Sequence, residues 1–341
     1  MGDLARGCGG GWRLTATVGA SAPRSKVIAA FAAVYVIWGS TYLAIRFAIE
    51  TLPGFLMAGV RFVLAGGFIL VWSKLRGAEL PGRAQWRAAA ITGTLLLLGG
   101  NGAVVWAERT IPSGVAALMV ATVPCWMVLL DWLRPGGIRP TGQIVAGLLL
   151  GLGGIAMLVG PDSLLGGGRL NPLGALALIG GSLSWAAGSI YSRQAAAPAR
   201  PFVATGMQML CGGCALLVAG TVVGEWSAAD LSAVSGRSLL ALVYLIVVGA
   251  IVGYTAYIWL LRVTTPARAS TYAYVNPVVA VLLGWLFAGE PISARMVVAA
   301  GIIIGGVALI TIARRPRVLI GPSPAASGVP VSLTDVSIER P

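Results

Sequence analysis

The 341-residue sequence contains no histidine, and only 10% of its residues are charged. A soluble globular domain carries about 25% charged residues, so this chain has too little charged surface to stay folded in water. Without histidine, the commonest metal ligand is missing. Cys211 and Cys214 form a C-x-x-C pattern, but no second Cys or His pair exists to complete a metal site. We therefore expect no metal and no cofactor.

The features of an enzyme or an ATP-driven pump are also missing. No G-x-x-x-x-G-K-[ST] loop is present. A membrane enzyme would need clustered carboxylates, a nucleophile with its base, or histidine ligands near the interface. The 11 acidic residues are scattered along the chain. The sequence therefore predicts a protein that is not an enzyme.

Long apolar blocks dominate what is present, since 57% of the residues are hydrophobic. A transmembrane helix needs roughly 17–25 predominantly apolar residues, and ten blocks of about this length occur. They cover residues 27–45, 55–73, 88–106, 112–131, 141–160, 172–191, 202–223, 238–260, 267–288 and 295–313. The sequence predicts an all-α integral membrane protein with ten transmembrane helices.

The basic residues predict the orientation of these helices. With the N-terminus in the cytoplasm, 18 of the 24 Lys and Arg fall on the cytoplasmic side, five fall outside, and Arg61 lies within a span. This is the positive-inside pattern, and it predicts that both termini are cytoplasmic. Because the pattern explains the net charge of +13, nucleic-acid binding is not needed to account for it.

The two halves of the chain resemble each other in the same order. Six of ten positions are identical between residues 124–133 and 277–286. Two further pairs of segments match: Gly39-Ser40-Thr41-Tyr42 with Gly188-Ser189-Ile190-Tyr191, and Gly147 and Gly151 with Gly301 and Gly305. Each half has five spans, so the second half enters the membrane from the opposite side. Inverted repeats of this kind are a common plan of secondary transporters.

The chain resembles the EamA-type branch of the drug/metabolite transporter superfamily, and most closely its YedA-like inner-membrane transporters. The resemblance covers residues 27–313 and rests on seven motifs: IWGSTY (37–42), AGVRF (58–62), GNG (100–102), IPSGVAA (111–117), TVP (122–124), SWAAGSIY (184–191) and YAYVNPVVAVLLG (272–284). It implies a ten-helix carrier made of two EamA repeats that exports small metabolites or toxic compounds across the bacterial inner membrane. Export is favoured over import by this resemblance alone.

We expect five regions along the chain. They are a disordered cytoplasmic leader (1–26), a first repeat (27–160), an external linker (161–171), a second repeat (172–313) and a disordered cytoplasmic tail (314–341). The expected partners are a small-molecule substrate and the lipid bilayer, and the protein is either a monomer or a dimer. The alternatives to a carrier are an integral membrane enzyme and a channel-like or assembly subunit.

Three polar or backbone features are candidates for the substrate path. Pro124 and Pro277 occupy matching mid-helix positions, where each proline leaves a carbonyl one turn earlier without its helical partner. Arg61 is a charge inside a span, which either contacts an anionic substrate or pairs with Glu50 or Glu108. Asn276 either lines the path or hydrogen-bonds across helices.

Aromatic side chains form a second set of candidates. Those predicted to line the path are Trp38, Tyr42, Trp185, Tyr191, Tyr254, Tyr257, Tyr272 and Tyr274. Their faces suit amphipathic or cationic solutes, although membrane-interface anchoring is the commoner role of Trp and Tyr. Glu108 and Asp131, at the ends of their spans, are candidate proton sites. The repeated G-x-x-x-G at residues 147–151 and 301–305 is expected to pack helices.

Overall fold

The computed structural model describes residues 23–79, 81–107, 109–110, 116, 119–137, 139–159, 171–196, 200–288 and 293–313, and every regular element in these ranges is helical. The predicted leader up to residue 22, the predicted linker up to residue 170 and the tail from residue 314 lie outside the described residues. Each of the ten predicted blocks contains described helix.

The helices of the first half are α1 (Arg24–Ala48), α2 (Gly54–Leu75), a continuous run of α3 (Arg83–Gly93), η1 (Thr94–Gly102) and α4 (Ala103–Ala107), then α6 (Val123–Leu133) and α7 (Gly142–Val159). Those of the second half are α9 (Pro172–Gln194), α10 (Pro201–Val222), the short η2 (Glu225–Ala228) and η3 (Leu231–Ala233), a continuous run of α11 (Gly236–Tyr244), η4 (Leu245–Tyr254) and α12 (Thr255–Val263), then α13 (Pro266–Ala269), α14 (Tyr272–Ala288) and α15 (Ala294–Ile312).

Seven of the described helices are long and apolar enough to cross a membrane. They are α1, α2, the α3–α4 run, α9, α10, the α11–α12 run and α15. Many large apolar side chains on them face outward, among them Leu75 and Val222, which are each 80% exposed. In water such a surface would drive aggregation, whereas in a bilayer it faces lipid.

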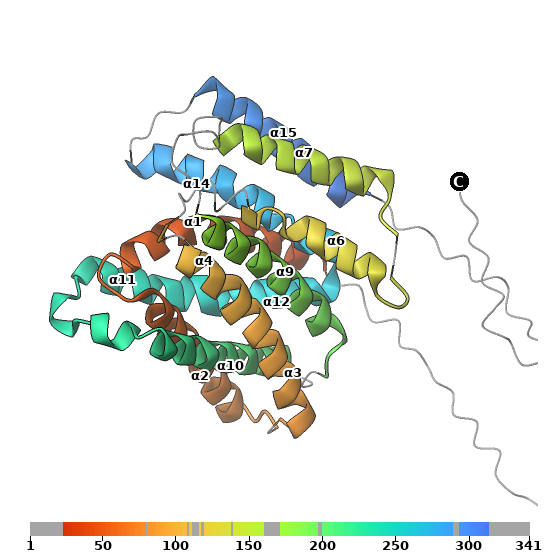
Figure 1. Cartoon of the computed structure of the whole chain (residues 1–341). Helices are drawn as coiled ribbons and strands as arrows, with labels where there is room; N and C mark the ends of the chain where they lie inside the picture. Colours follow the sequence, from red (N-terminus) through yellow and green to blue (C-terminus); the bar gives the residue numbers. More distant parts are fainter. Residues whose placement is uncertain are drawn as a thin grey trace, which may run out of the picture.

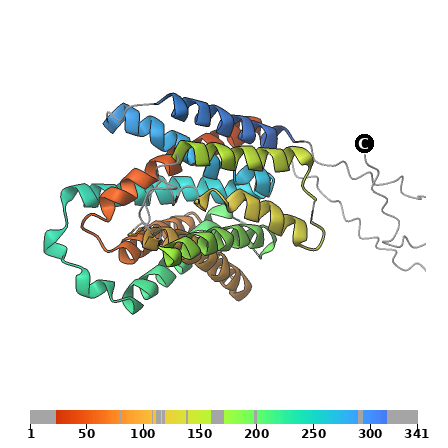
Figure 2. The ribbon, with the colours of Figure 1, turned by 45° about the horizontal axis from the view of Figure 1, so that its top comes forward.

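Two tight helix pairs lie on opposite flanks of the bundle. Helices α2 and α10 pack along each other on one flank, and α7 packs on α15 on the other. Figure 1 shows α1 and α9 between these flanks. Figure 2 shows α7 and α15 running side by side. In between, α1 packs on α14 and on the α11–α12 run, while α9 packs on α6 and on the α3–α4 run.

Glycines set the closest helix approaches, because a small residue lets two backbones meet. A Cβ on Gly147 would lie 2.7 Å from the Gly306 carbonyl oxygen, so α7 and α15 touch at these two positions. The expected packing role of Gly301 and Gly305 is wrong: no described residue lies within 4 Å of a Cβ built on either. The helix period places Gly306, one residue later, on the face that meets α7.

The fourth and ninth predicted helices are both interrupted by a short turn, at residues 121–122 and 270–271. The two turns are built alike. The Thr122 hydroxyl donates to the Met119 carbonyl at 2.6 Å, and the Thr271 hydroxyl donates to the Arg268 carbonyl at 2.7 Å. The two threonines therefore occupy equivalent places in the two halves.

This break corrects the expectation for the two prolines. Pro124 lies in the first turn of α6, where a proline needs no N–H, and it is not in the middle of a helix. Pro277 lies inside α14 as expected. Relative to the threonines, Pro124 comes two residues later and Pro277 six residues later. The two prolines are therefore about one helical turn out of register.

The third and eighth predicted helices each contain a π-helical stretch, which the sequence did not reveal. The stretch η1 starts at Thr94 in the first half, and η4 starts at Leu245 in the second. A π-helix widens the helix and recurs at functional sites. Here both stretches face the centre of the molecule, where they supply residues to the cavity described next.

Candidate functional site

A cavity of about 100 Å³ lies among helices from both halves of the chain. Side chains of α1, α2, α6 and the α3–α4 run form one part of its wall, and side chains of α9, the α11–α12 run and α14 form the rest. The residues that line it are Trp38, Thr41, Ile45, Arg61, Phe62, Gly100, Asn101, Val104, Val120, Val123, Gly181, Ser182, Trp185, Tyr254, Tyr272 and Asn276.

Among the described lining residues Arg61 is the charged one, and it is only 4% exposed. It lies in the N-terminal half of α2, and its guanidinium stands 4.5 Å from the centre of the Phe62 ring. Its Nε is buried without a hydrogen-bond partner. A Cβ built on Gly249 of η4 would lie 3.4 Å from its Nη2, so the guanidinium spans the space between α2 and η4.

None of the described acidic residues lines the cavity. Glu50, a predicted partner of Arg61, lies 3.7 Å from Arg237 instead. Asp131 lies 2.7 Å from Arg134 at the end of α6, away from the cavity lining. Hydrogen bonds from the Ser232 hydroxyl and amide hold the pKa of Asp230 below its ordinary value. Glu108, the other predicted partner, lies outside the described residues.

Two amide side chains bring unused hydrogen-bonding capacity to the cavity. The Oδ1 atoms of Asn101 and Asn276 are buried and have no partner, and Asn276 is 2% exposed. The hydroxyls nearby are already engaged: Thr41 donates to the Trp38 carbonyl at 2.8 Å, and Ser182 donates to the Met119 carbonyl at 3.2 Å. A buried polar atom without a partner is costly, so the two amides are suited to a polar solute.

Four aromatic rings pack together at the cavity, and three of them, Trp38, Trp185 and Tyr272, line it. Trp38, Trp185, Tyr257 and Tyr272 have neighbouring ring centres 4.8–5.6 Å apart, and we call these residues the aromatic floor. Hydrogen bonds fix them: the Trp185 Nε1 donates to the Tyr257 hydroxyl at 3.0 Å, and that hydroxyl lies 2.7 Å from the Ser189 hydroxyl. Tilted and edge-on ring pairs of this kind are favourable.

Further hydrogen bonds join helices next to the aromatic floor. One turn before Trp38, the Tyr35 hydroxyl lies 2.5 Å from the Thr271 hydroxyl and so links α1 to the turn before α14. Arg193, near the end of α9, donates to the carbonyls of Leu261 and Thr264 at the end of α12. The Tyr35–Thr271 contact joins the first half to the second, and the Arg193 bonds join α9 to α12.

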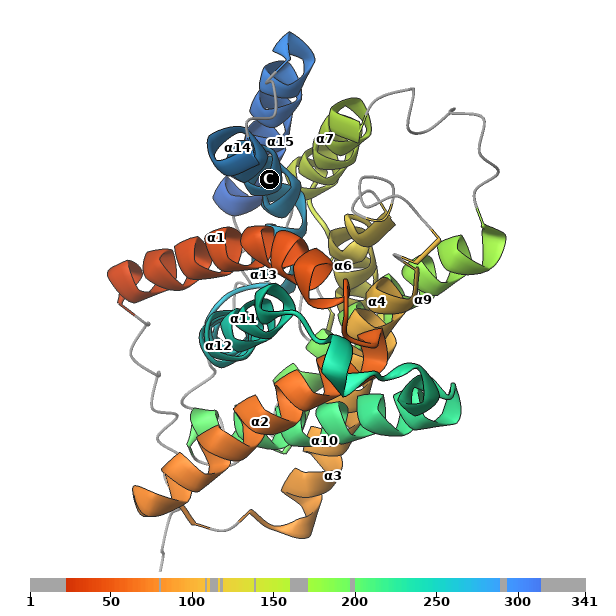
Figure 3. The same ribbon diagram turned by 90° about the vertical axis from the view of Figure 1, so that its left-hand side faces the viewer.

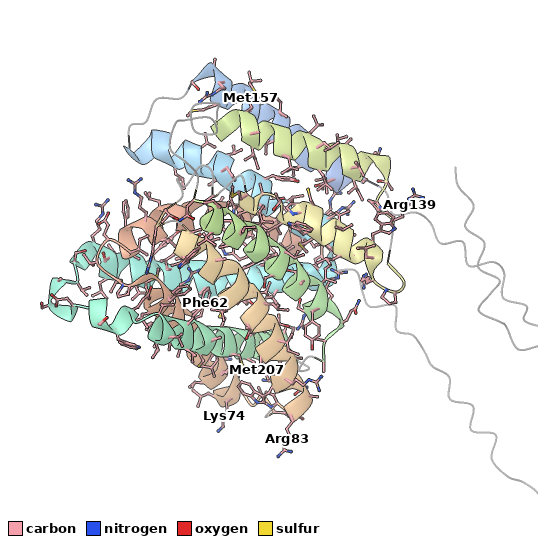
Figure 4. All side chains as sticks on the ribbon, viewed as in Figure 1. Phe62, Lys74, Arg83, Arg139, Met157 and Met207 are labelled. Atoms are coloured by element: carbon pink, nitrogen blue, oxygen red, sulfur yellow. The ribbon has the colours of Figure 1, made fainter. Side chains whose placement is uncertain are left out.

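Figure 4 shows where several labelled side chains lie on the helices. The Phe62 side chain, next to Arg61, lies within the bundle, whereas Lys74 and Arg83 extend outward at the ends of α2 and α3. These two charged side chains therefore lie at helix ends, whereas Arg61 lines the cavity.

The structure brings six of the predicted path residues to the cavity wall: Trp38, Arg61, Trp185, Tyr254, Tyr272 and Asn276. Tyr257 lies behind the wall in the aromatic floor, and Pro277 is buried without lining it. Pro124 and Tyr191 do not line it either, although Val123 beside Pro124 does. The Tyr42 side chain and Glu108 lie outside the described residues.

Tyr274 lies away from the cavity, in a second cluster of apolar residues under α7. Its hydroxyl donates to the Leu148 carbonyl at 3.4 Å, and a Cβ on Gly151 would lie 2.6 Å from its ring. Tyr274 therefore holds α14 against α7. The neighbouring Tyr272 and Asn276 point to the cavity from the same helix.

Sequence reasoning missed Asn101 as a site residue. The motif Gly100-Asn101-Gly102 is visible in the sequence, but only the π-helical turn of η1 shows that its amide reaches the cavity. Sequence reasoning also missed Glu225, which looks like a loop charge but is 5% exposed. Among the described residues no group of three or more Cys, Asp or Glu is arranged to hold a metal ion.

Comparisons with known proteins agree with this architecture. The inner-membrane transporter YedA of Escherichia coli (strain K12) is 43% identical over 283 residues, which cover 83% of this chain and 89% of that protein. The transporter YvbV of Bacillus subtilis is 23% identical, over 84% of this chain and 92% of YvbV. A crystal structure 22% identical in sequence shares the fold, with a TM-score of 0.67 over 84% of this chain and 97% of that chain.

The family model for EamA-like transporters matches the chain twice, at residues 25–160 and at residues 172–312. The two matches together cover most of the sequence and the described helices α1 to α15. The chain belongs to the EamA-like transporter family, and it is a membrane transporter.

Proposed function

We propose that this protein is a secondary transporter that exports small metabolites or drug-like solutes across the bacterial inner membrane, by alternating access of two inverted halves. The observation that carries the proposal is the cavity lined by helices of both halves, with the aromatic floor packed at its wall. A carrier needs a site that is open to one side at a time.

The packing of the helices supports two equivalent halves. Helix α1 packs on α14 and on the α11–α12 run, and its counterpart α9 packs on α6 and on the α3–α4 run. Exchanging the halves exchanges these two sets of contacts. The pairs α2–α10 and α7–α15 join counterparts to each other, as they would across a twofold axis.

Local structure repeats in the same order along both halves. The π-helical stretches start at Thr94 and Leu245, and the threonine turns follow at Thr122 and Thr271, so the two pairs keep nearly the same spacing. The family model matches the chain twice, at residues 25–160 and 172–312, and these ranges nearly coincide with the two proposed repeats. We therefore retain the proposed repeats 27–160 and 172–313, each of five spans and of opposite orientation.

Such a pair of halves can adopt two states of similar energy, because each state repeats the contacts of the other with the halves exchanged. With the N-terminus in the cytoplasm, the aromatic floor and the Tyr35–Thr271 contact lie on the cytoplasmic side of the cavity. The structure then corresponds to a state that is closed toward the cytoplasm. Transport requires these contacts to open.

The orientation has its own test, because Lys and Arg side chains at the helix ends predict it. Ser227 in η2 is exposed on the predicted external side, and Ala84 in α3 is exposed on the predicted cytoplasmic side. In a variant without the four native cysteines, we expect a membrane-impermeant maleimide to label Ser227→Cys in intact cells. Ala84→Cys should be labelled only after lysis, and the reverse pattern would overturn the N-in orientation.

The function is tested by metabolite profiling of cells and medium. We would compare the native protein, a vector control and two variants, all produced at equal membrane levels. Gly100→Ala places a methyl group against Trp185 at the cavity wall, whereas Gly180→Ala meets no described residue and is the matched control. Export predicts at least one compound that accumulates in the medium with the native protein and with Gly180→Ala, but not with the vector or Gly100→Ala. Depletion of a compound from the medium would instead show uptake and overturn the proposed direction.

A further inference from the structure

Arg61 carries a charge that the described part of the protein does not neutralise. It lines the cavity, is 4% exposed, and has a buried Nε without a partner. An arginine side chain stays protonated in proteins, and a buried charge without a counter-charge is unfavourable. An anion that binds beside Arg61 would remove this penalty.

The rest of the cavity restricts what such an anion looks like. The described residues of its lining include no carboxylate, so among them a cationic solute would meet Arg61 without a compensating negative charge. The walls are mainly apolar, with the rings of Trp38, Trp185 and Tyr272 on one side. Asn101 and Asn276 offer buried amide oxygens that lack hydrogen-bond partners.

The arginine is also held in place for this task. Its guanidinium stacks 4.5 Å from the Phe62 ring centre, and Gly249 of η4 leaves the space that it occupies. The planar fork of a guanidinium matches the two oxygens of a carboxylate. A solute can then extend from Arg61 across the cavity toward the aromatic floor.

We propose that the cavity binds a small organic acid, with its carboxylate on Arg61, its apolar body against the aromatic floor, and a further polar group at Asn101 or Asn276. This inference rests on the proposed carrier function and specifies its substrate class. The aromatic rings then pack against the apolar part of an anion and do not bind a cation.

Matched probes test the charge preference directly. Phenylacetate, phenylacetamide and 2-phenylethylamine have similar size and differ in charge. With the purified full chain in lipid nanodiscs, we would measure binding by titration calorimetry and by the shift of the thermal unfolding midpoint, which rises when a ligand binds the folded state. Empty nanodiscs correct for partition into lipid.

We expect the native protein to bind phenylacetate at least about tenfold more tightly than phenylacetamide, which corresponds to about 1.4 kcal/mol, and to bind 2-phenylethylamine most weakly. Arg61→Gln should abolish the preference for the acid, and Arg61→Lys should keep part of it. The control Arg46→Gln removes an exposed arginine at the end of α1 and should leave binding unchanged.

Two further comparisons keep the test decisive. If Arg61→Gln does not fold, Asn101→Asp brings a negative charge into the same cavity and should weaken phenylacetate binding selectively. Equal or weaker binding of phenylacetate than of the amide by the native protein would overturn the inference, as would an acid preference that survives in Arg61→Gln. If profiling finds a cationic export substrate, the carrier function stands and the organic-acid inference fails.

Discussion

At the residue scale, Gly100 and Trp185 meet closely at the cavity wall. A Cβ built on Gly100 would lie 2.6 Å from Cε3 of Trp185 and 3.2 Å from its Cβ. The indole cannot retreat easily, because its Nε1 is bonded to Tyr257 and its ring packs on Trp38. A single added methyl group must therefore displace the aromatic floor.

We predict that Gly100→Ala reduces transport of the identified solute at least about tenfold. Overpacking of this kind costs about 1–3 kcal/mol, and here the displaced ring belongs to the cavity. Gly180→Ala on α9 is the matched control, since no described residue lies within 4 Å of a Cβ at that position. Initial transport rates in vesicles, normalised to protein amount, give the answer, and equal rates for the two variants would contradict the prediction.

The position of a residue at the cavity was predictable where its type is unusual in an apolar span. Arg61 stands out because a charge inside an apolar block needs a reason, and Trp38 and Trp185 stand out as aromatics beside small residues. Asn101 did not stand out, because its direction depends on the π-helical turn of η1. Tyr272 and Tyr274 look alike in sequence, yet one faces the cavity and the other faces α7.

At the scale of elements, the loop after α10 stabilises the start of α2. Glu225 in η2 accepts a hydrogen bond from the Leu56 amide at 3.0 Å and pairs with Arg109 after α4. The amides in the first turn of a helix lack helical partners, and a negative charge there is favourable. One buried carboxylate thus ties together segments that lie far apart in the sequence.

We predict that Glu225→Ala lowers the free energy of unfolding by about 1–3 kcal/mol, the cost of leaving buried partners unsatisfied. Glu225→Gln should lose less, because the amide oxygen can still accept from Leu56. Glu79→Ala is the control, since Glu79 is exposed in the turn after α2. The midpoint of thermal unfolding in detergent should be highest for Glu79→Ala, lower for Glu225→Gln and lowest for Glu225→Ala. Any other order would contradict the capping role.

The positions of the helices were predictable because hydropathy reports which segments can enter the bilayer. Their interruptions were not. Next to the turn at 121–122 and in η1, the carbonyls of Met119 and Leu95 accept hydrogen bonds from Ser182 and Ser184 of the distant helix α9. No local sequence pattern marks the turn or the π-helical stretches. The matched prolines suggested two equivalent kinks, yet Pro124 begins α6 after the break while Pro277 lies inside α14.

At the scale of the whole molecule, alternating access requires the closed end of the cavity to open. The Tyr35–Thr271 contact, at 2.5 Å between hydroxyl oxygens, connects the two halves at that end. A single hydrogen bond contributes about 0.5–1.5 kcal/mol to stability, so a carrier can break it in every cycle. A covalent bridge at the same place cannot be broken.

We predict that bridging these positions stops transport reversibly. Tyr35→Cys and Thr271→Cys would be combined in a variant without the four native cysteines, and a short thiol-reactive reagent with an internal disulfide would link them. A direct disulfide is not expected, because a cysteine sulfur reaches less far than a tyrosine hydroxyl. Each single-cysteine variant, treated with the same reagent, is the control.

Transport by the bridged protein should fall to the level of empty vesicles and return when the internal disulfide is reduced, while the single-cysteine controls keep their activity. This result would tie transport to the opening of one end, because the bridge changes no residue of the cavity lining. Full transport by completely bridged protein would show that the halves need not separate there. A fixed pore through the bundle would then describe the protein better than an alternating carrier.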